Sequence, residues 1–373
     1  MPDTILALRE LPYEPLANSS NAIRLVLLRP RSYQPSCGTA TNAVYCKLVN
    51  VVRGDNCPTY TAVSYAWGNN PGLSSLVVDQ QAYEVSLNVE QVLRQLRHAR
   101  EDSYIWVDQI CIDQENDSEK THQVQQMRHI YNEAQLVVAW LGPTANGSDL
   151  LLKHIERMGD AVWADDEKSI VAAHQNEEGR KLIARAFRHF CEREYWQRLW
   201  VIQEFTVGNK LCIACGDVLL RDWNLLALLV FLNKAKDGDL LSEVVEENIC
   251  RAILQTYDTP TRSFMEGIVT RRTRYATEDA KEENSLFSVL VSTLVLENDY
   301  NFPQATDPRD RVYAVLNLAE DAADFQALPS YHLSCEEVYR EVALGILRQG
   351  NIDILSYCQF PRTASGLPTW APD

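Results

Sequence analysis

The stretch YIWVDQICI, residues 104–112, is a buried-looking apolar run with one acid, Asp108, inside it. Such a run is typical of a central strand in a parallel sheet, because helices cover both faces of that sheet. Asp108 is expected in the middle or at the end of this strand. A buried carboxylate must be paired or hydrogen-bonded to keep its charge, so Asp108 is either part of a site or a structural acceptor for loop amides.

Segments on both sides of this run extend the pattern. Two stretches of helical periodicity, residues 89–99 and 119–134, separate segments that are predicted to be strands. Strands that alternate with helices indicate an α/β core with a mostly parallel sheet, and the chain becomes mainly helical after residue 143. The predicted strands and hairpins are AVYCKLVNVV (43–52), YTAVSYA (60–66), SLVVDQQAYEVS (75–86), QLVVAWLG (135–142) and KLCIACGDVLL (210–220).

Composition excludes several classes of protein. The 373 residues are 46% hydrophobic and 23% charged, as in a globular protein, and the formal net charge of −16 disfavours binding to nucleic acid. The longest apolar run, residues 225–232, is too short to span a bilayer, and the N-terminus lacks the features of a signal peptide. A cytoplasmic location is therefore expected. Cys212 and Cys215 form a lone CxxC without a second ligand pair, so no metal site is predicted.

The motif AVSYAWG, residues 62–68, places three polar or aromatic side chains at the carboxyl end of a predicted strand. In open parallel sheets, ligands bind at that edge, because loop amides and helix N-termini converge there. Ser64, Tyr65 and Trp67 are therefore candidate ligand-binding residues. The alternative is that Tyr65 and Trp67 are aromatic residues of the core.

The motif REYWQRLWVIQE, residues 193–204, is predicted to form one helix that carries Tyr195, Trp196, Trp200 and Glu204 as an aromatic ribbon ending in an acid. A carboxylate beside indole rings loses hydration, so its pKa is expected to rise. Such a group suits the stabilisation of an oxocarbenium-like sugar centre. The alternative is an amphipathic helix in which Glu204 pairs with a nearby arginine, Arg198 or Arg193.

The motif TDPRDRVYAVLNLA, residues 306–319, begins with alternating charges and continues as a predicted helix. Its arginines can hold a phosphate. They can equally form a structural node of ion pairs with Asp307 and Asp310, and the sequence leaves both alternatives open.

Taken in order, the motifs of this chain resemble those of the fungal heterokaryon-incompatibility (HET) domain. The resemblance covers residues 41–373, with a core at about 41–215 and a helical part at about 216–373, after an N-terminal extension (1–40). It ends without the tryptophan that often closes the family pattern, so the native chain is expected to continue. The matching stretches are SYAWG (64–68), WVDQICIDQ (106–114), QVQQMRHIYNEAQLVVAWLG (123–142), RLWVIQE (198–204), DPRDRVYAVLNLA (307–319) and LPTWAPD (367–373).

The resemblance carries expectations for fold and function. HET domains are linked to non-self recognition and regulated cell death, and they are similar to TIR domains, which have a flavodoxin-like sheet. The fold expected here is such a mostly parallel core, with a long helical insertion and a helix-rich C-terminal half. Some TIR domains hydrolyse NAD to nicotinamide and ADP-ribose through a helix-borne glutamate, with NAD as substrate and no further cofactor.

By this resemblance Glu204 is the catalytic residue, and activation is expected to involve a homo-oligomer and an upstream sensor. Two other functions remain open: a non-catalytic oligomerising module, and a nucleotide sensor without turnover. The residues expected to bind the substrate are Ser64, Tyr65, Trp67, Asp108, Trp200, Arg198 and Arg311.

Overall fold

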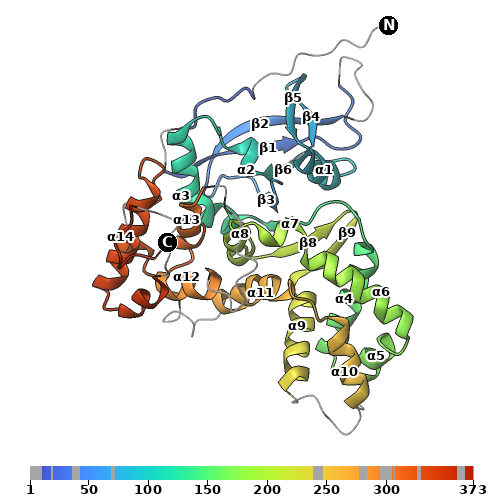
Figure 1. The fold of residues 1–373 in the computed structure, drawn as a ribbon. Helices are drawn as coiled ribbons and strands as arrows, with labels where there is room; N and C mark the ends of the chain where they lie inside the picture. Colours follow the sequence, from blue (N-terminus) through green and yellow to red (C-terminus); the bar gives the residue numbers. More distant parts are fainter. Residues whose placement is uncertain are drawn as a thin grey trace.

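One nine-stranded sheet forms the centre of the computed structural model, and helices pack around it (Figure 1). The predicted α/β class is confirmed. No helix in the described part of the chain is long and apolar enough to cross a membrane. The structure describes residues 11–17, 20–35, 43–68, 72–237, 247–276, 284–294, 305, 307–325, 329–358 and 366–372.

The strand order is β5-β4-β2-β1-β6-β3-β7-β8-β9. The four neighbours β6, β3, β7 and β8 are parallel, whereas β1–β2, β1–β6, β4–β5 and β8–β9 are antiparallel pairs. The sheet is therefore mixed, and its parallel part lies mainly at the centre. The strands are β1 (Ala22–Leu28), β2 (Val44–Val52), β3 (Tyr60–Tyr65), β4 (Leu73–Val78), β5 (Gln81–Ser86), β6 (Ser103–Trp106), β7 (Leu136–Trp140), β8 (Leu211–Cys215) and β9 (Val218–Arg221).

The parallel centre has the strand order of a flavodoxin-like sheet. In chain order β3, β6, β7 and β8 are the first to fourth parallel strands, and they lie side by side in the order 2-1-3-4. The order reverses at β3, which has β6 on one side and β7 on the other. Ligands of open α/β sheets bind beside the carboxyl ends of the strands at such a reversal. The closer likeness to TIR domains stays a prediction.

The antiparallel pairs at the two edges of the sheet, β4–β5 and β8–β9, follow from short turns. Asp79 (φ 45°) and Gln80 (φ 71°) connect β4 to β5, and both adopt the left-handed backbone that a two-residue hairpin turn requires. Gly216 (φ 54°) plays the same part between β8 and β9. Both predicted hairpins are confirmed.

Helices fill the connections of the sheet and most of the C-terminal half. Helices α4 to α7 form the long insertion that the sequence predicts between WLGP (140–143) and RLWVIQE (198–204), and α8 follows it before β8. Figure 1 shows α4, α5, α6, α9 and α10 together at one end of the molecule, and α12, α13 and α14 together at another. The α-helices are α1 (Leu87–Leu96), α2 (Asp108–Cys111), α3 (Asp117–Glu133), α4 (Ser148–Trp163), α5 (Glu167–Ala173), α6 (Glu177–Cys191), α7 (Glu194–Gln197), α8 (Val201–Val207), α9 (Asp222–Asp237), α10 (Glu247–Thr256), α11 (Arg262–Ala276), α12 (Leu286–Leu294), α13 (Asp310–Leu316) and α14 (Cys335–Arg348).

The predicted central strand over residues 104–112 is shorter than expected. It ends at Trp106, and Asp108 is the first residue of the short helix α2. The backbone N–H of Cys111 donates to the carbonyl of Val107 at 2.8 Å and closes a helical turn. Ile110 and Cys111 are fully buried in that turn. A short apolar run fits a buried helix as well as a buried strand, so the sequence pattern alone does not distinguish the two.

Strand β1 lies within residues 1–40, which the sequence predicts to be an N-terminal extension. It pairs with β2 along its whole length and with β6 through three residues, Val26 to Leu28. All but one of its side chains are buried. Residues 22–28 therefore contribute to the same core as the motifs that follow.

A buried arginine on β1 joins the sheet to its surroundings. Nη1 of Arg24 donates to the carbonyl of Cys111 at 2.9 Å and to Oε1 of Glu119 at 2.8 Å, and Nη2 donates to the carbonyl of Glu14 at 2.9 Å. Its guanidinium also lies 4.6 Å from the ring centroid of Tyr13. One side chain thus connects β1, α2, α3 and the segment before the sheet.

Replacing Arg24 with alanine should destabilise the fold strongly. The change leaves Glu119 and the Cys111 carbonyl without their buried partner, and loss of one partner of a buried ion pair costs about 3–5 kcal/mol. Urea unfolding measures the effect. The matched control is Arg29→Ala, because Arg29 pairs with Asp102 near the surface, where a pair contributes about 1 kcal/mol or less. Equal losses in the two variants would contradict this assignment.

Candidate functional site

A cavity of about 1010 Å³ lies at the carboxyl end of β3, where the order of the parallel strands reverses. One wall comes from the end of β3, α2 and the junction of α7 with α8. The other walls come from α3 and from the C-terminal segment around α13. The lining residues are Ala66, Trp67, Gly68, Asp108, Ile112, Gln114, Lys120, Val124, Met127, Glu194, Gln197, Arg198, Trp200, Ala305, Asp307, Pro308, Arg309, Asp310, Tyr331, Ser334 and Cys335.

The stretch that was predicted as one helix over residues 193–204 is broken in the middle. Helix α7 ends at Gln197, Arg198 has extended backbone (φ −81°, ψ 130°), and α8 begins at Val201. The break has a physical reason, because Arg198 reaches out of the helical path to bond the end of β3. Its Nη1 donates to the carbonyl of Tyr65 at 2.6 Å.

Glu204 lies behind this wall, and its side chain is completely buried. Its Oε2 accepts a hydrogen bond of 2.6 Å from Oγ of Ser64, which in turn lies 2.9 Å from the hydroxyl of Tyr195. Its Oε1 lies 3.7 Å from Nη1 of Arg198, a distance for an ion pair but not for a hydrogen bond. Neither Ser64 nor Glu204 lines the cavity.

Arg198 stands between Glu204 and the cavity. It belongs to the cavity wall, and its Nη2 donates to Oδ2 of Asp108 at 3.1 Å. The guanidinium also lies 5.5 Å from the ring centroid of Trp67 and 5.8 Å from that of Tyr65. Burial by itself lowers the pKa of Arg198, but the carboxylates of Glu204 and Asp108 outweigh it and raise the pKa, so the arginine stays charged.

Asp108 has both of the roles that the sequence offers as alternatives, a structural acceptor and a residue of the site. Its carboxylate accepts hydrogen bonds from Nε1 of Trp67 at 2.9 Å and from the backbone N–H of Gln109 at 2.7 Å, in addition to the bond from Arg198. It also lines the cavity, although its own exposure is only 5%. The same carboxylate is therefore a structural acceptor and part of the cavity wall.

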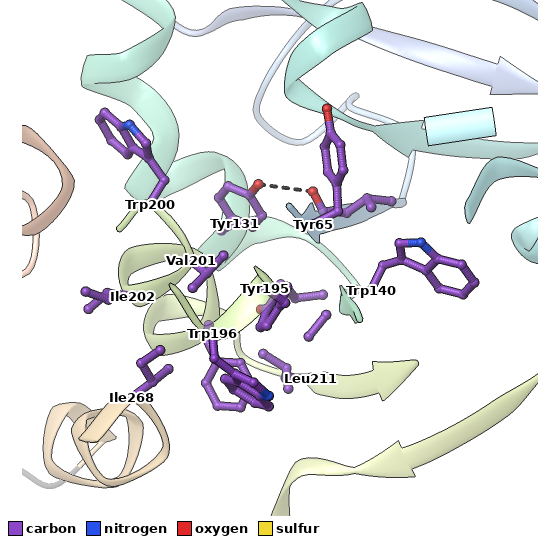
Figure 2. Packing of buried hydrophobic residues seen from close by; sticks show 14 of the residues in the cluster. Tyr65, Tyr131, Trp140, Tyr195, Trp196, Trp200, Val201, Ile202, Leu211 and Ile268 are labelled. Carbon is purple, nitrogen blue, oxygen red and sulfur yellow. Dashed lines mark hydrogen bonds between the residues drawn. The ribbon is translucent and has the colours of Figure 1, made fainter. Parts of the chain in front are cut away.

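Trp200 faces away from the other aromatic residues of its motif. Tyr195 and Trp196 pack together with ring centroids 5.1 Å apart, whereas Figure 2 shows Trp200 well separated from both. Its Nε1 donates to Oδ2 of Asp310 on α13 at 3.0 Å. The predicted continuous aromatic ribbon is therefore not formed, because the break at Arg198 turns α8 relative to α7.

The structure brings most of the predicted residues together but separates one from the rest. Trp67, Asp108, Arg198 and Trp200 line the cavity, and Ser64, Tyr65 and Glu204 lie buried directly behind it. Arg311 is exposed and does not line the cavity.

The cavity wall also contains Arg309, Lys120 and Tyr331, which are not among the predicted site residues. Arg309 lies in the cavity wall where Arg311 had been expected, and it pairs with Asp307 at 2.6 Å, as the ion-pair alternative for this motif requires. Lys120 and Tyr331 also line the cavity. The motif at residues 306–319 correctly indicates that the segment around Arg309 lies at the site. No feature of the sequence around Lys120 indicates a site, and its place in the cavity wall follows only from the packing of α3.

Burial raises the pKa of the Glu204 carboxyl to about 7, against an ordinary value of 4.5. Arg198 opposes this shift, and the nearby Asp108 adds to it. A carboxyl group without water is costly to ionise, which is the general cause of such shifts. Strongly shifted acids beside a cavity are frequent at functional sites, although buried structural networks produce them too. Within the described residues no group of three or more His, Cys, Asp or Glu side chains is arranged to hold a metal ion.

Comparison with known proteins matches residues 60–204 to the family model described as "Heterokaryon incompatibility protein (HET)". These residues are therefore similar to the HET family. This HET segment begins with the first residue of β3 and ends at Glu204, so it contains Ser64, Asp108, Arg198 and Glu204. The resemblance drawn from the motifs is therefore confirmed for this part of the chain.

The whole chain aligns with one curated protein in particular. It is 27% identical over 431 aligned positions to heterokaryon incompatibility protein 6, OR allele, of Neurospora crassa, and the alignment covers 100% of this chain and 60% of that protein. The chain thus spans about 60% of the length of this relative. No solved structure matches the chain.

The raised pKa of Glu204 predicts how stability depends on pH. Between about pH 4.5 and 7 the carboxyl ionises in the unfolded chain but stays protonated in the folded one, so the wild-type protein loses stability as pH rises. Glu204→Gln imitates the protonated form and removes this dependence. Relative to the variant, the wild type should lose about 3 kcal/mol of unfolding free energy over this range. Denaturant unfolding at several pH values measures this difference, and parallel pH curves for the two proteins would contradict it.

Proposed function

We propose that this chain is a cell-death effector of fungal heterokaryon incompatibility, and that it acts by hydrolysing NAD in the cytoplasm. The first part draws on the HET segment and on the name of the Neurospora crassa relative. The second part draws on the acid, the cavity and their position in the sheet.

The observation that carries the proposal is the hydrogen bond between Ser64 and Glu204, 2.6 Å long, directly behind a cavity at the strand reversal. It joins a strand-end motif to a helix-borne acid that is 140 residues away in sequence. The cavity volume of about 1010 Å³ lies at the upper end of the range of small-molecule and cofactor sites. A dinucleotide is a ligand of suitable size for such a site.

The reaction breaks the glycosidic bond between C1′ of the ribose and the nitrogen of nicotinamide. Nicotinamide leaves with the bonding electron pair and becomes neutral, and the ribosyl centre gains oxocarbenium character. The ionised carboxylate of Glu204 would stabilise this cation until water adds to C1′ and releases a proton. Trp67 and Trp200 in the cavity wall offer aromatic surface against which the ligand packs.

Access to Glu204 requires a change of conformation. Arg198 covers the acid, and three groups hold it there: the Tyr65 carbonyl, Asp108 and Glu204 itself. Cleavage therefore requires that the Arg198 side chain withdraws, and we propose that assembly into a homo-oligomer, driven by an upstream sensor, causes this. Activity should then rise with protein concentration.

A second candidate function is a non-catalytic interaction module, and the complete burial of Glu204 favours it. In that case the network of Ser64, Arg198 and Asp108 has a structural role. It connects β3, α2 and α8, and partner recruitment replaces chemistry.

Glu204→Gln separates the two functions. The variant keeps the size of the side chain but removes its charge, so a catalytic role predicts a loss of NAD hydrolysis on the order of a hundred- to a thousand-fold. Release of nicotinamide from NAD is measured at several concentrations of purified protein, together with the melting temperature. At neutral pH the variant should melt at or above the wild-type temperature, because it carries no buried charge at this position.

The matched control is Glu194→Gln, which alters an exposed acid at the rim of the same cavity. It should retain NAD hydrolysis at the wild-type rate. Hydrolysis by the Glu204 variant at the wild-type rate would exclude Glu204 as the catalytic residue. A wild-type protein that releases no nicotinamide at any concentration, even when clustered artificially, would leave the interaction module as the function.

A further inference from the structure

Among the described residues, three cationic side chains line the cavity. They differ in how many of their hydrogen-bond donors already have protein partners. Arg198 bonds the Tyr65 carbonyl and Asp108 and also lies beside Glu204. Arg309 is used still more fully. Its Nε and Nη2 bond both carboxylate oxygens of Asp307, and its Nη1 donates to the carbonyls of Tyr331 and Leu333, each at 2.7 Å. The charge of each arginine is therefore already paired with at least one protein carboxylate.

Lys120 is the exception. It lies in the first part of α3, it is half-buried, and its ammonium lies 5.0 Å from the ring centroid of Tyr331. Within the described residues it makes no ion pair and no hydrogen bond through its side chain. An ammonium group has three donors, so Lys120 keeps them available toward the cavity.

The carboxylates near Lys120 do not use those donors. The positive charge of Lys120 acts to lower the pKa of Asp307 and of Asp310, but both acids already have other hydrogen-bond partners. Asp307 is paired with Arg309, and Asp310 accepts hydrogen bonds from Nε1 of Trp200 at 3.0 Å and from the hydroxyl of Tyr331 at 2.8 Å. Lys120 therefore carries a positive charge in this wall that forms no ion pair with a described carboxylate.

We propose that Lys120 binds a phosphate group of the ligand, and that the cavity takes a nucleoside diphosphate or a molecule that contains one. The chemistry agrees on both sides, since a lysine ammonium is a point-charge partner for phosphate and the aromatic rings of Trp67 and Tyr331 suit a base or sugar. Arg311, which the motif suggested for this role, lies outside the cavity. The identity of the ligand as NAD rests on the proposed function, whereas the phosphate site does not.

The test measures equilibrium binding, so it does not depend on turnover. Binding of ADP to the full chain is followed by calorimetry for the wild type, Lys120→Met, Lys120→Arg and the control Lys153→Met, which alters an exposed lysine on α4. Methionine keeps the length and the aliphatic packing of the side chain but removes its charge. Without the charge-assisted hydrogen bond to phosphate, Lys120→Met should bind ADP roughly tenfold more weakly or worse, with Lys120→Arg close to the wild type. Lys153→Met should bind as the wild type does.

Adenosine, which lacks phosphate, serves as the second ligand. Its affinity should be equal in the wild type and Lys120→Met, because adenosine offers Lys120 no phosphate to bind. Equal affinity of both proteins for ADP would overturn the proposal, and so would failure of the wild type to bind ADP at millimolar concentration. A Lys120→Met protein that melts like the wild type and loses only ADP binding supports the phosphate site, whether or not NAD is cleaved. Failure of NAD hydrolysis alone would therefore count against the proposed function and not against this site.

Discussion

The guanidinium of Arg198 connects the end of the central strand β3 to α2 and to the helix that bears Glu204. It contacts the last carbonyl of β3, the first acid of α2 and the buried acid of α8. A charge in this position would be costly without partners, so its three neighbours fix the place where α7 stops and α8 starts. Part of the cavity wall follows from this requirement, because Trp67 and Asp108 both contact this side chain.

Two carboxylates share this one guanidinium, and they do not share it equally. Asp108 lies at hydrogen-bond distance and has further donors from Trp67 and from the backbone. Glu204 lies farther from Arg198, has Ser64 as its hydrogen-bond donor and lies fully out of contact with water. The unequal environments keep one acid in a well-supported position and leave the other with a raised pKa. Pairs of acids whose surroundings differ in this way are a common arrangement where one group is to change its charge.

The sequence predicted the fold class well because hydrophobic periodicity records burial directly. The strands over residues 60–66 and 135–142 and both hairpins were found from apolar runs and turn residues alone. The length of the strand that begins at Ser103 and the break at Arg198 could not be found in this way. Both depend on hydrogen bonds to distant parts of the chain, such as the bond between Arg198 and Tyr65, and local periodicity carries no information about them. Local periodicity also gives no information about Lys120. This lysine stands out because the carboxylates near it, Asp307 and Asp310, are bonded to other residues.

The long insertion between β7 and β8 has a consequence for the order in which the molecule assembles. A growing chain that has emerged only as far as β7 already contains Ser64 and Asp108 but neither Arg198 nor Glu204. Helices α4 to α6 must follow before those two residues exist to complete the network, and contacts of such long sequence separation form late. Chains that stop before residue 204 therefore lack the buried acid altogether. The architecture therefore delays completion of the network of Ser64, Asp108, Arg198 and Glu204 until the whole insertion and α8 have been synthesised.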